Sequence, residues 1–159
     1  MALYETAVIT CNLGNTRIYL FRKGNLSCLS EDHNQAQVMY KNGVITADKV
    51  AAHPKRNKLT QYLGAMPEGK QTEPYYSEVE VKHGDIFIIC SSAFCNSVDD
   101  ESLCDMVRSS RSLSQIAEKL MQAAATKGFT EDTSILVVRA DAHEKAVAPV
   151  AAGMAAASA

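Results

Sequence analysis

The sequence lacks the features that mark membrane-spanning and nucleic-acid-binding proteins. No stretch approaches the roughly 20 consecutive apolar residues that a transmembrane helix needs. The formal net charge is -2, so no basic excess is available to meet the phosphates of a nucleic acid or of an anionic membrane. The densest basic stretch, residues 53–58, is short and contains no aromatic residue. We therefore expect neither a nucleic-acid partner nor a membrane partner.

Cysteine pairing motifs are also absent. The five cysteines form no CxxC pair, and no histidine stands at zinc-finger spacing from them. Their odd number and the lack of an apolar, signal-like N-terminus predict reduced thiols in a cytoplasmic protein. Most of the five lie in apolar runs, which favours buried packing, with a reactive thiol at Cys90 or Cys95 as the alternative. The five are Cys11, Cys28, Cys90, Cys95 and Cys104.

Strand patterns dominate the first half of the chain. Residues 5–12 and 16–21 are β-rich, and the Leu13-Gly14-Asn15 turn between them is typical of a hairpin with Asn15 in a left-handed conformation. A second turn at residues 23–25 leads into a further predicted strand, 26–29. Later strands are predicted at residues 75–81, 85–91 and 134–139. The continuous apolar run within 85–91 indicates a central strand that is covered on both faces.

Helical patterns occur between these strands. We predict helices at residues 34–43, 46–49, 99–108 and 112–127, and an extended loop at residues 53–74. Residues 142–159 are rich in alanine but have no amphipathic face, so we expect a disordered tail after a single domain of residues 1–141. The predicted class is α+β, with antiparallel sheet flanked by helices.

Five segments, in chain order, carry a more specific pattern. They are VITCNLGNTRIYL at 8–20, LSEDHN at 29–34, GVIT with HPKRNKLTQYLG at 43–64, VKHGDIFIICS at 81–91 and EDTSILVVR at 131–139. Together they resemble the C-terminal half of the PPM-type (metal-dependent, type 2C) protein serine/threonine phosphatases. The resemblance implies a half, or a remodelled version, of an α-β-β-α sandwich of two antiparallel sheets. It also implies hydrolysis of phosphoserine and phosphothreonine with two Mg²⁺ or Mn²⁺ ions held by carboxylates.

The sequence departs from the family pattern at the positions that bind metal. Ser92 stands where the family has a metal-bridging aspartate, and Asn15 stands where an aspartate helps to hold an accessory metal. Glu131 aligns with a later ligand aspartate and Asp132 with the asparagine beside it. A neutral hydroxyl or amide brings no charge to a hard divalent ion, so we expect no tightly bound metal at these degenerate positions. No histidine is placed near Ser92 by sequence, so we assign no catalytic residue.

The remaining family ligands lie on a segment for which the sequence offers no counterpart. The family's DGHGG motif is not found, and residues 1–6 cannot supply it. We therefore predict a catalytically impaired relative, a pseudophosphatase that acts as a regulatory or protein-interaction module. The alternative is a Mn- or Mg-dependent serine/threonine phosphatase that is active only when another chain supplies the other half. A non-functional remnant is the third possibility.

Two expectations about packing follow from the same resemblance. Half of a two-sheet sandwich leaves a sheet face and strand edges uncovered, so we expect a protein partner or self-association into a homo-oligomer. The face expected to be uncovered carries Ile86, Ile88, Ile135 and Val137. The two framework histidines, His33 and His53, are predicted to make structural hydrogen bonds rather than to bind metal.

Overall fold

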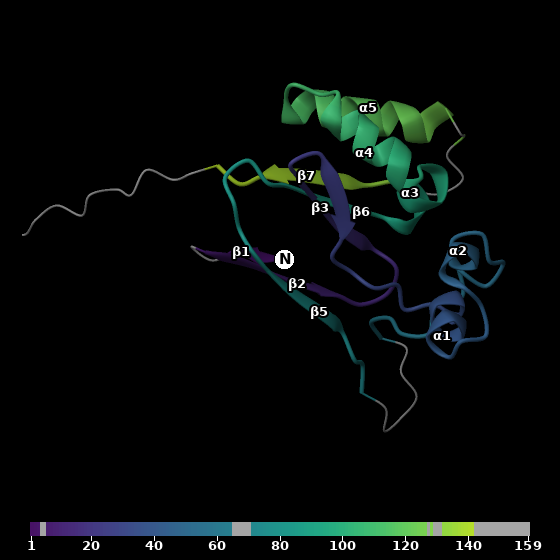
Figure 1. Ribbon diagram of the computed structural model, residues 1–159. Coiled ribbons are helices and arrows are strands. Elements are labelled where there is room, and N and C mark those ends of the chain that lie inside the picture. The colour runs from purple at the N-terminus through teal and green to yellow at the C-terminus, as the bar shows by residue number, and fades with distance from the viewer. Residues whose placement is uncertain (4–5, 65–70, 127, 129–131, 142–159) are drawn as a thin grey trace, which may run out of the picture.

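The computed structural model describes residues 1–3, 6–64, 71–126, 128 and 132–141 (Figure 1). The predicted tail, residues 142–159, and the candidate ligand Glu131 lie outside the described residues. Two antiparallel sheets stack on one another, and three helices lie over one of them (Figure 1). The α+β class with antiparallel sheets is therefore confirmed.

The two sheets are unequal in size. The three-stranded sheet has the order β1-β2-β5 and the four-stranded sheet the order β4-β3-β6-β7, with every neighbouring pair antiparallel. The strands span Ala2–Leu3 (β1), Ala7–Asn12 (β2), Arg17–Arg22 (β3), Asn25–Cys28 (β4), Tyr75–Glu80 (β5), Ile86–Cys90 (β6) and Ile135–Arg139 (β7).

The hairpin predicted between residues 5–12 and 16–21 is wrong. β2 pairs with β5 and β3 pairs with β6, so the turn that joins β2 to β3 carries the chain from one sheet to the other. Gly14 takes the left-handed conformation there, with φ of 99°, whereas Asn15 does not. The second predicted hairpin is confirmed: β3 and β4 pair through Arg22 and Asn25, around a turn in which Lys23 has φ of 49°.

The predicted helices are present, and one more was missed. α1 (Gln35–Lys41), α2 (Ala47–Val50), α4 (Asp100–Arg108) and α5 (Leu113–Thr126) match the predicted segments. The side chain of Asn34 caps α1 by accepting a hydrogen bond from Gln37 N at 2.9 Å. The missed helix is α3, Ser92–Ser97, directly after β6. No helix in the described part of the chain is long and apolar enough to cross a bilayer.

The core has two layers. Between the sheets, Val8, Ile18 and Phe87 are buried with Leu20 and Leu29. On the other side of the four-stranded sheet lies a second layer, formed with α3, α4 and α5 (Figure 1). Its buried members are Tyr19, Ile88, Cys90, Phe94, Val98, Leu103, Val107, Ile116, Leu120 and Ala124. Alternate residues of β6 enter the two layers, which confirms the prediction of a central strand covered on both faces.

The expected uncovered sheet face is covered by the chain's own helices. Ile88 is fully buried, and Ile86, Ile135 and Val137 pack against the same helical layer, so the prediction for this face is wrong. The apolar face of α5 packs against β7 and covers this part of the sheet. No described helix lies over the outward face of the three-stranded sheet (Figure 1).

Candidate functional site

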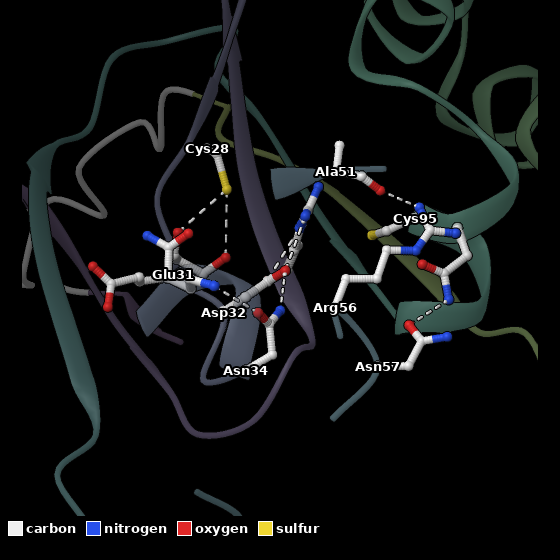
Figure 2. Close-up of polar contacts among 12 residues, drawn as sticks. Cys28, Glu31, Asp32, Asn34, Ala51, Arg56, Asn57 and Cys95 are labelled. Atoms are coloured by element: carbon white, nitrogen blue, oxygen red, sulfur yellow. Dashed lines mark hydrogen bonds and ion pairs between the residues drawn. The ribbon is translucent and has the colours of Figure 1, made fainter. Parts of the chain in front are cut away.

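A small polar pocket lies where the end of β6 and the start of α3 approach the start of β3. Its volume is about 40 Å³. The loop after α2 closes one side (Figure 2). The pocket is lined by Asn15, Arg17, Asp32, Asn34, Val50, Ala51, Arg56, Asn57, Ser92, Cys95 and Asn96. The structure thus brings Asn15 and Ser92, the two positions predicted to be degenerate, to one pocket.

Reciprocal hydrogen bonds hold the turn that carries Asn15 beside the segment that carries Asp32. Gly14 N donates to His33 Nδ1 at 3.1 Å, and His33 N donates back to Gly14 O at 2.8 Å. Asn12 and Glu31 pair in the same way, with Asn12 Nδ2 donating to Glu31 O at 2.7 Å. His33 is buried and its ring nitrogen accepts from the backbone, as the structural role predicted for it requires.

Arg17 and Asp32 form the main charged contact in the pocket. Arg17 Nε donates to Asp32 Oδ1 at 3.1 Å and Nη2 donates to Oδ2 at 2.9 Å, a bidentate pair. The bond with Asp32 raises the pKa of the Arg17 guanidinium, against the opposing effect of burial. Asn34 Nδ2 also donates to Asp32 Oδ2, at 3.3 Å (Figure 2). Both carboxylate oxygens of Asp32 therefore already have donors within the protein.

The opposite wall comes from the loop after α2. The bridge between Asn34 and Leu59, with Gln35 N donating to Lys58 O at 2.9 Å, fixes this loop against α1. Arg56 donates from Nη1 to the carbonyl of Ala51 (Figure 2), and none of the ion pairs in the described residues involves Arg56. Its positive charge is therefore not neutralised by a described acid.

α3 supplies the third side of the pocket. Ser92 is the first residue of this helix, and Asn96 lies one turn further on. Asn96 Nδ2 donates to Asn57 Oδ1 at 3.3 Å, which ties α3 to the loop after α2 (Figure 2). Phe94 is fully buried beneath the helix and anchors it to the core.

The polar groups of this pocket do not suit a pair of hard divalent ions. Mg²⁺ and Mn²⁺ prefer several carboxylate oxygens, and among the described residues Asp32 is the only carboxylate that lines the pocket. Arg17 already binds that carboxylate, and the second guanidinium, Arg56, adds positive charge. Among the described residues, no group of three His, Cys, Asp or Glu side chains could hold a metal ion. Asp132 is exposed and does not line the pocket.

Several pocket residues were not singled out from the sequence. Arg17 and Asp32 fall within segments that resemble the family motifs, so the motifs could have identified both residues as candidates. Arg56 and Asn57 fall in the predicted long loop, whose path depends on the contacts of Leu59 and Lys58 with the start of α1. Asn96 depends on α3, the helix that was not predicted.

Comparison with known proteins identifies the family. The family model described as "Protein phosphatase 2C" matches residues 49–133, more than half of the chain. The chain therefore belongs to the protein phosphatase 2C family, the PPM-type phosphatases, as its motifs predicted.

Its similarity to individual relatives runs along most of the chain. It is 26% identical over 144 residues to a putative protein phosphatase 2C-type protein of Streptococcus pyogenes, a match that covers 91% of this chain and 57% of the relative. It is 29% identical over 141 residues to a serine/threonine phosphatase of Listeria welshimeri, covering 89% of this chain and 55% of the relative. The chain thus spans a little over half the length of these curated relatives.

Solved structures show the same fold. The Mycobacterium tuberculosis serine/threonine phosphatase PstP/Ppp superposes with a TM-score of 0.76 at 24% identity, over 86% of this chain and 56% of that one. Stp1 from Staphylococcus aureus gives a TM-score of 0.78 at 19% identity, over 88% and 54%. A PstP catalytic domain was crystallised with two manganese ions and gives a TM-score of 0.70 at 21% identity, over 85% and 54%. At these identities the likeness concerns the fold.

Proposed function

We propose that this chain is a catalytically impaired PPM-type domain, a pseudophosphatase that acts as a regulatory or protein-interaction module in the cytoplasm. The observation that carries the proposal is the chemistry of the pocket. Ser92 and Asn15 both line the pocket, and both bring neutral side chains to positions where the family motifs have aspartate. Asp32, the one carboxylate among the described residues that line the pocket, is held by Arg17.

The charge balance of the pocket argues against metal-dependent hydrolysis. In this family's reaction, metal ions supply the activated water that attacks phosphorus. A divalent ion beside Asp32 would have to compete with Arg17 for both carboxylate oxygens while also facing the charge of Arg56. The described side chains of the pocket can bind a polar or anionic group by hydrogen bonds, but they offer one carboxylate where two hard cations need several.

The outward face of the three-stranded sheet is the surface that we propose for a protein partner or for a second copy of this chain. The register places Cys11 opposite Tyr76, and Ile9 opposite Glu78, on this face. Tyr76 is 64% exposed. The opposite, four-stranded sheet is covered by helices, and a partner helix could cover this face in the same way (Figure 1). The apolar groups of β2 on this face suit an apolar patch on a partner or on a second copy of this chain.

The second candidate function is that of a phosphatase completed by another polypeptide, because this chain spans only a little over half the length of its relatives. Relatives named as serine/threonine phosphatases match this chain over 55% of their own length. If another polypeptide supplied the remaining ligands, the assembled site could act as a Mn- or Mg-dependent serine/threonine phosphatase. In that case Arg17 would have to release Asp32, or the metal ligands would have to come from elsewhere.

Hydrolysis assays separate the two functions. The full chain, incubated with Mn²⁺ and either a phosphothreonine peptide or p-nitrophenyl phosphate, is expected to release phosphate no faster than buffer. The Ser92→Asp variant should be equally inactive, because a single carboxylate does not complete a binuclear site. Turnover by the wild-type chain that depends on Mn²⁺ would overturn the pseudophosphatase proposal. Turnover that appears only on addition of a second polypeptide would establish the alternative.

A further inference from the structure

Two thiols lie in contact at the edge of the pocket, and the proposed function does not use them. Cys90 ends β6 and is buried, whereas Cys95 lies in α3, is partly exposed and lines the pocket. Their sulfur atoms are 3.4 Å apart. Neither is disulfide-bonded. The other cysteines are not arranged in this way: Cys28 contacts Ser30, and Cys104 contacts the carbonyl of Gly24.

The surroundings make the two thiols chemically unequal. The hydrogen bond from Cys90 lowers the pKa of the Cys95 thiol, and the nearby Arg17 guanidinium lowers it further, against the effect of burial. The same sulfur–sulfur contact, together with burial, raises the pKa of Cys90. Thiolate, not thiol, is the nucleophile, so Cys95 is the more reactive member of the pair. Arg17 is fixed beside it by Asp32.

Access to Cys95 comes through the pocket. A volume of about 40 Å³ holds about three water-sized molecules, at roughly 10–15 Å³ for each. A hydroperoxide is of this size, whereas a bulky thiol reagent is not. Cys90 is buried in the core, and its sulfur atom contacts that of Cys95.

We propose that Cys90 and Cys95 are an oxidation site that hydrogen peroxide converts to an intrachain disulfide. The Cys95 thiolate attacks one peroxide oxygen, the O–O bond breaks, and the leaving oxygen takes up a proton to depart as water. Cys95 is then a sulfenic acid. Cys90 loses its proton and attacks the Cys95 sulfur, the S–S bond forms, and the S–O bond breaks to release a second water. Two thiols lose two electrons in total, and one hydrogen peroxide is reduced to two waters.

The geometry needs only a small movement to form this bond. A disulfide has a sulfur–sulfur length of about 2.05 Å, so the two atoms must approach by roughly 1.4 Å. The bond would link the end of β6 to α3, the helix that carries Ser92 and Asn96 into the pocket. Oxidation would therefore fix this wall of the pocket, and a thiol reductant would release it. This inference goes beyond the proposed function and holds whether or not the domain hydrolyses phosphate.

Mass spectrometry of a simplified chain tests the proposal. A full-length variant with Cys11→Ser, Cys28→Ser and Cys104→Ser keeps only the pair. Treated with one equivalent of hydrogen peroxide, it should lose about 2 Da, the mass of two hydrogens, and resist alkylation by iodoacetamide until it is reduced. Peptide mapping should recover a Cys90–Cys95 link. Alkylation of both thiols after peroxide treatment, with no mass loss, would overturn the proposal.

Two further measurements complete the test. The first identifies which thiol reacts first, and the second uses the wild-type chain, in which no substitution can disturb the fold. With Cys90→Ala in the same background, Cys95 should gain about 16 Da as the trapped sulfenic acid. In the wild-type chain, Cys95 should oxidise faster than the exposed Cys11, by about tenfold or more, because the Cys95 sulfur accepts a hydrogen bond from Cys90 and lies near the Arg17 guanidinium. Oxidation of Cys11 while the pair stays reduced would contradict the proposal in a chain with all its native side chains.

Discussion

Arg17 and Asp32 are joined by two parallel hydrogen bonds, of 3.1 and 2.9 Å, inside the pocket that also contains Ser92 and Asn15. The carboxylate thereby serves to link β3 to the segment that leads into α1. The side chains of this pocket are thus held in place by hydrogen bonds to one another.

Replacing Arg17 should destabilise the fold. In Arg17→Met, the carboxylate of Asp32, only 13% exposed, loses its charged partner, so the free energy of unfolding should fall by about 2 kcal/mol. The matched control is Arg108→Met, which breaks a pair with Asp105 in which both side chains are more than half exposed. That change should cost at most about 0.5 kcal/mol. Urea unfolding of the two variants measures both, and equal losses would contradict the role given to Arg17.

The ion pair of Arg22 with Asp85 should make stability depend on acid pH. Burial opposes ionisation of Asp85, but hydrogen bonds from Arg22 at 2.6 Å and from Lys82 N at 2.7 Å outweigh it, so the pKa of Asp85 is lowered. A carboxyl whose pKa is lower in the folded state stabilises the fold above its unfolded pKa, about 3.9. This contribution is lost as the pH falls through the folded pKa.

The free energy of unfolding should therefore decline as the pH drops below about 4. Asp85→Asn removes the ionisable group and should flatten this part of the profile. Asp141→Asn is the matched control, because Asp141 also pairs with an arginine but is exposed. Urea unfolding between pH 3 and pH 7 compares the three proteins. An unchanged slope in Asp85→Asn would show that another group is responsible.

The cover of the four-stranded sheet depends on α5. Leu120 is fully buried in the helical layer, so Leu120→Ala should lower the free energy of unfolding by about 2–5 kcal/mol. The next residue, Met121, is 38% exposed, and Met121→Ala should cost well under that amount. Thermal unfolding followed by circular dichroism measures the stability loss of both variants. A small effect at Leu120 would mean that α5 does not cover the sheet in solution.

How much of this architecture the sequence predicted depends on the range of the interactions involved. The apolar run of β6 and the apolar stripe of α5 are local periodic patterns, and both elements were predicted. The pairing of β2 with β5 joins Cys11 to Tyr76, far along the chain, and no local pattern specifies such a partner. The hairpin prediction failed for this reason: the Gly14 turn has the composition of a hairpin but crosses between sheets.

The missed helix α3 has a similar explanation. Its six residues include Ser, Cys and Asn, which have modest helix propensity, so its stability comes from Phe94 packing into the core.

The pocket was predicted in part. Ser92 and Asn15 were identified through the family motifs and meet in space, whereas Arg56 and Asn57 enter from a loop whose position depends on backbone bonds to α1. The role of Glu131 stays a prediction, because it lies outside the described residues.

The outward face of the three-stranded sheet should drive assembly. At micromolar concentration the full chain, of 17.2 kDa, is expected to run as a dimer or larger species by size-exclusion chromatography with light scattering. Tyr76→Glu places another carboxylate beside those of β5 and should weaken association about tenfold or more, a loss of about 1.4 kcal/mol. Tyr40→Glu, at a tyrosine of α1 that is 42% exposed, is the control and should leave assembly unchanged. A monodisperse monomer would contradict self-association through this face.

Calorimetric titration of the full chain with Mn²⁺ measures whether this pocket binds a divalent metal ion tightly. Because Ser92 and Asn15 are neutral and Asp32 is held by Arg17, no site tighter than about millimolar is expected, the weak end for hard cations with few carboxylate ligands. Asn15→Asp combined with Ser92→Asp adds two carboxylates to the same pocket and should strengthen Mn²⁺ binding measurably. A micromolar Mn²⁺ site in the wild-type chain would contradict the account.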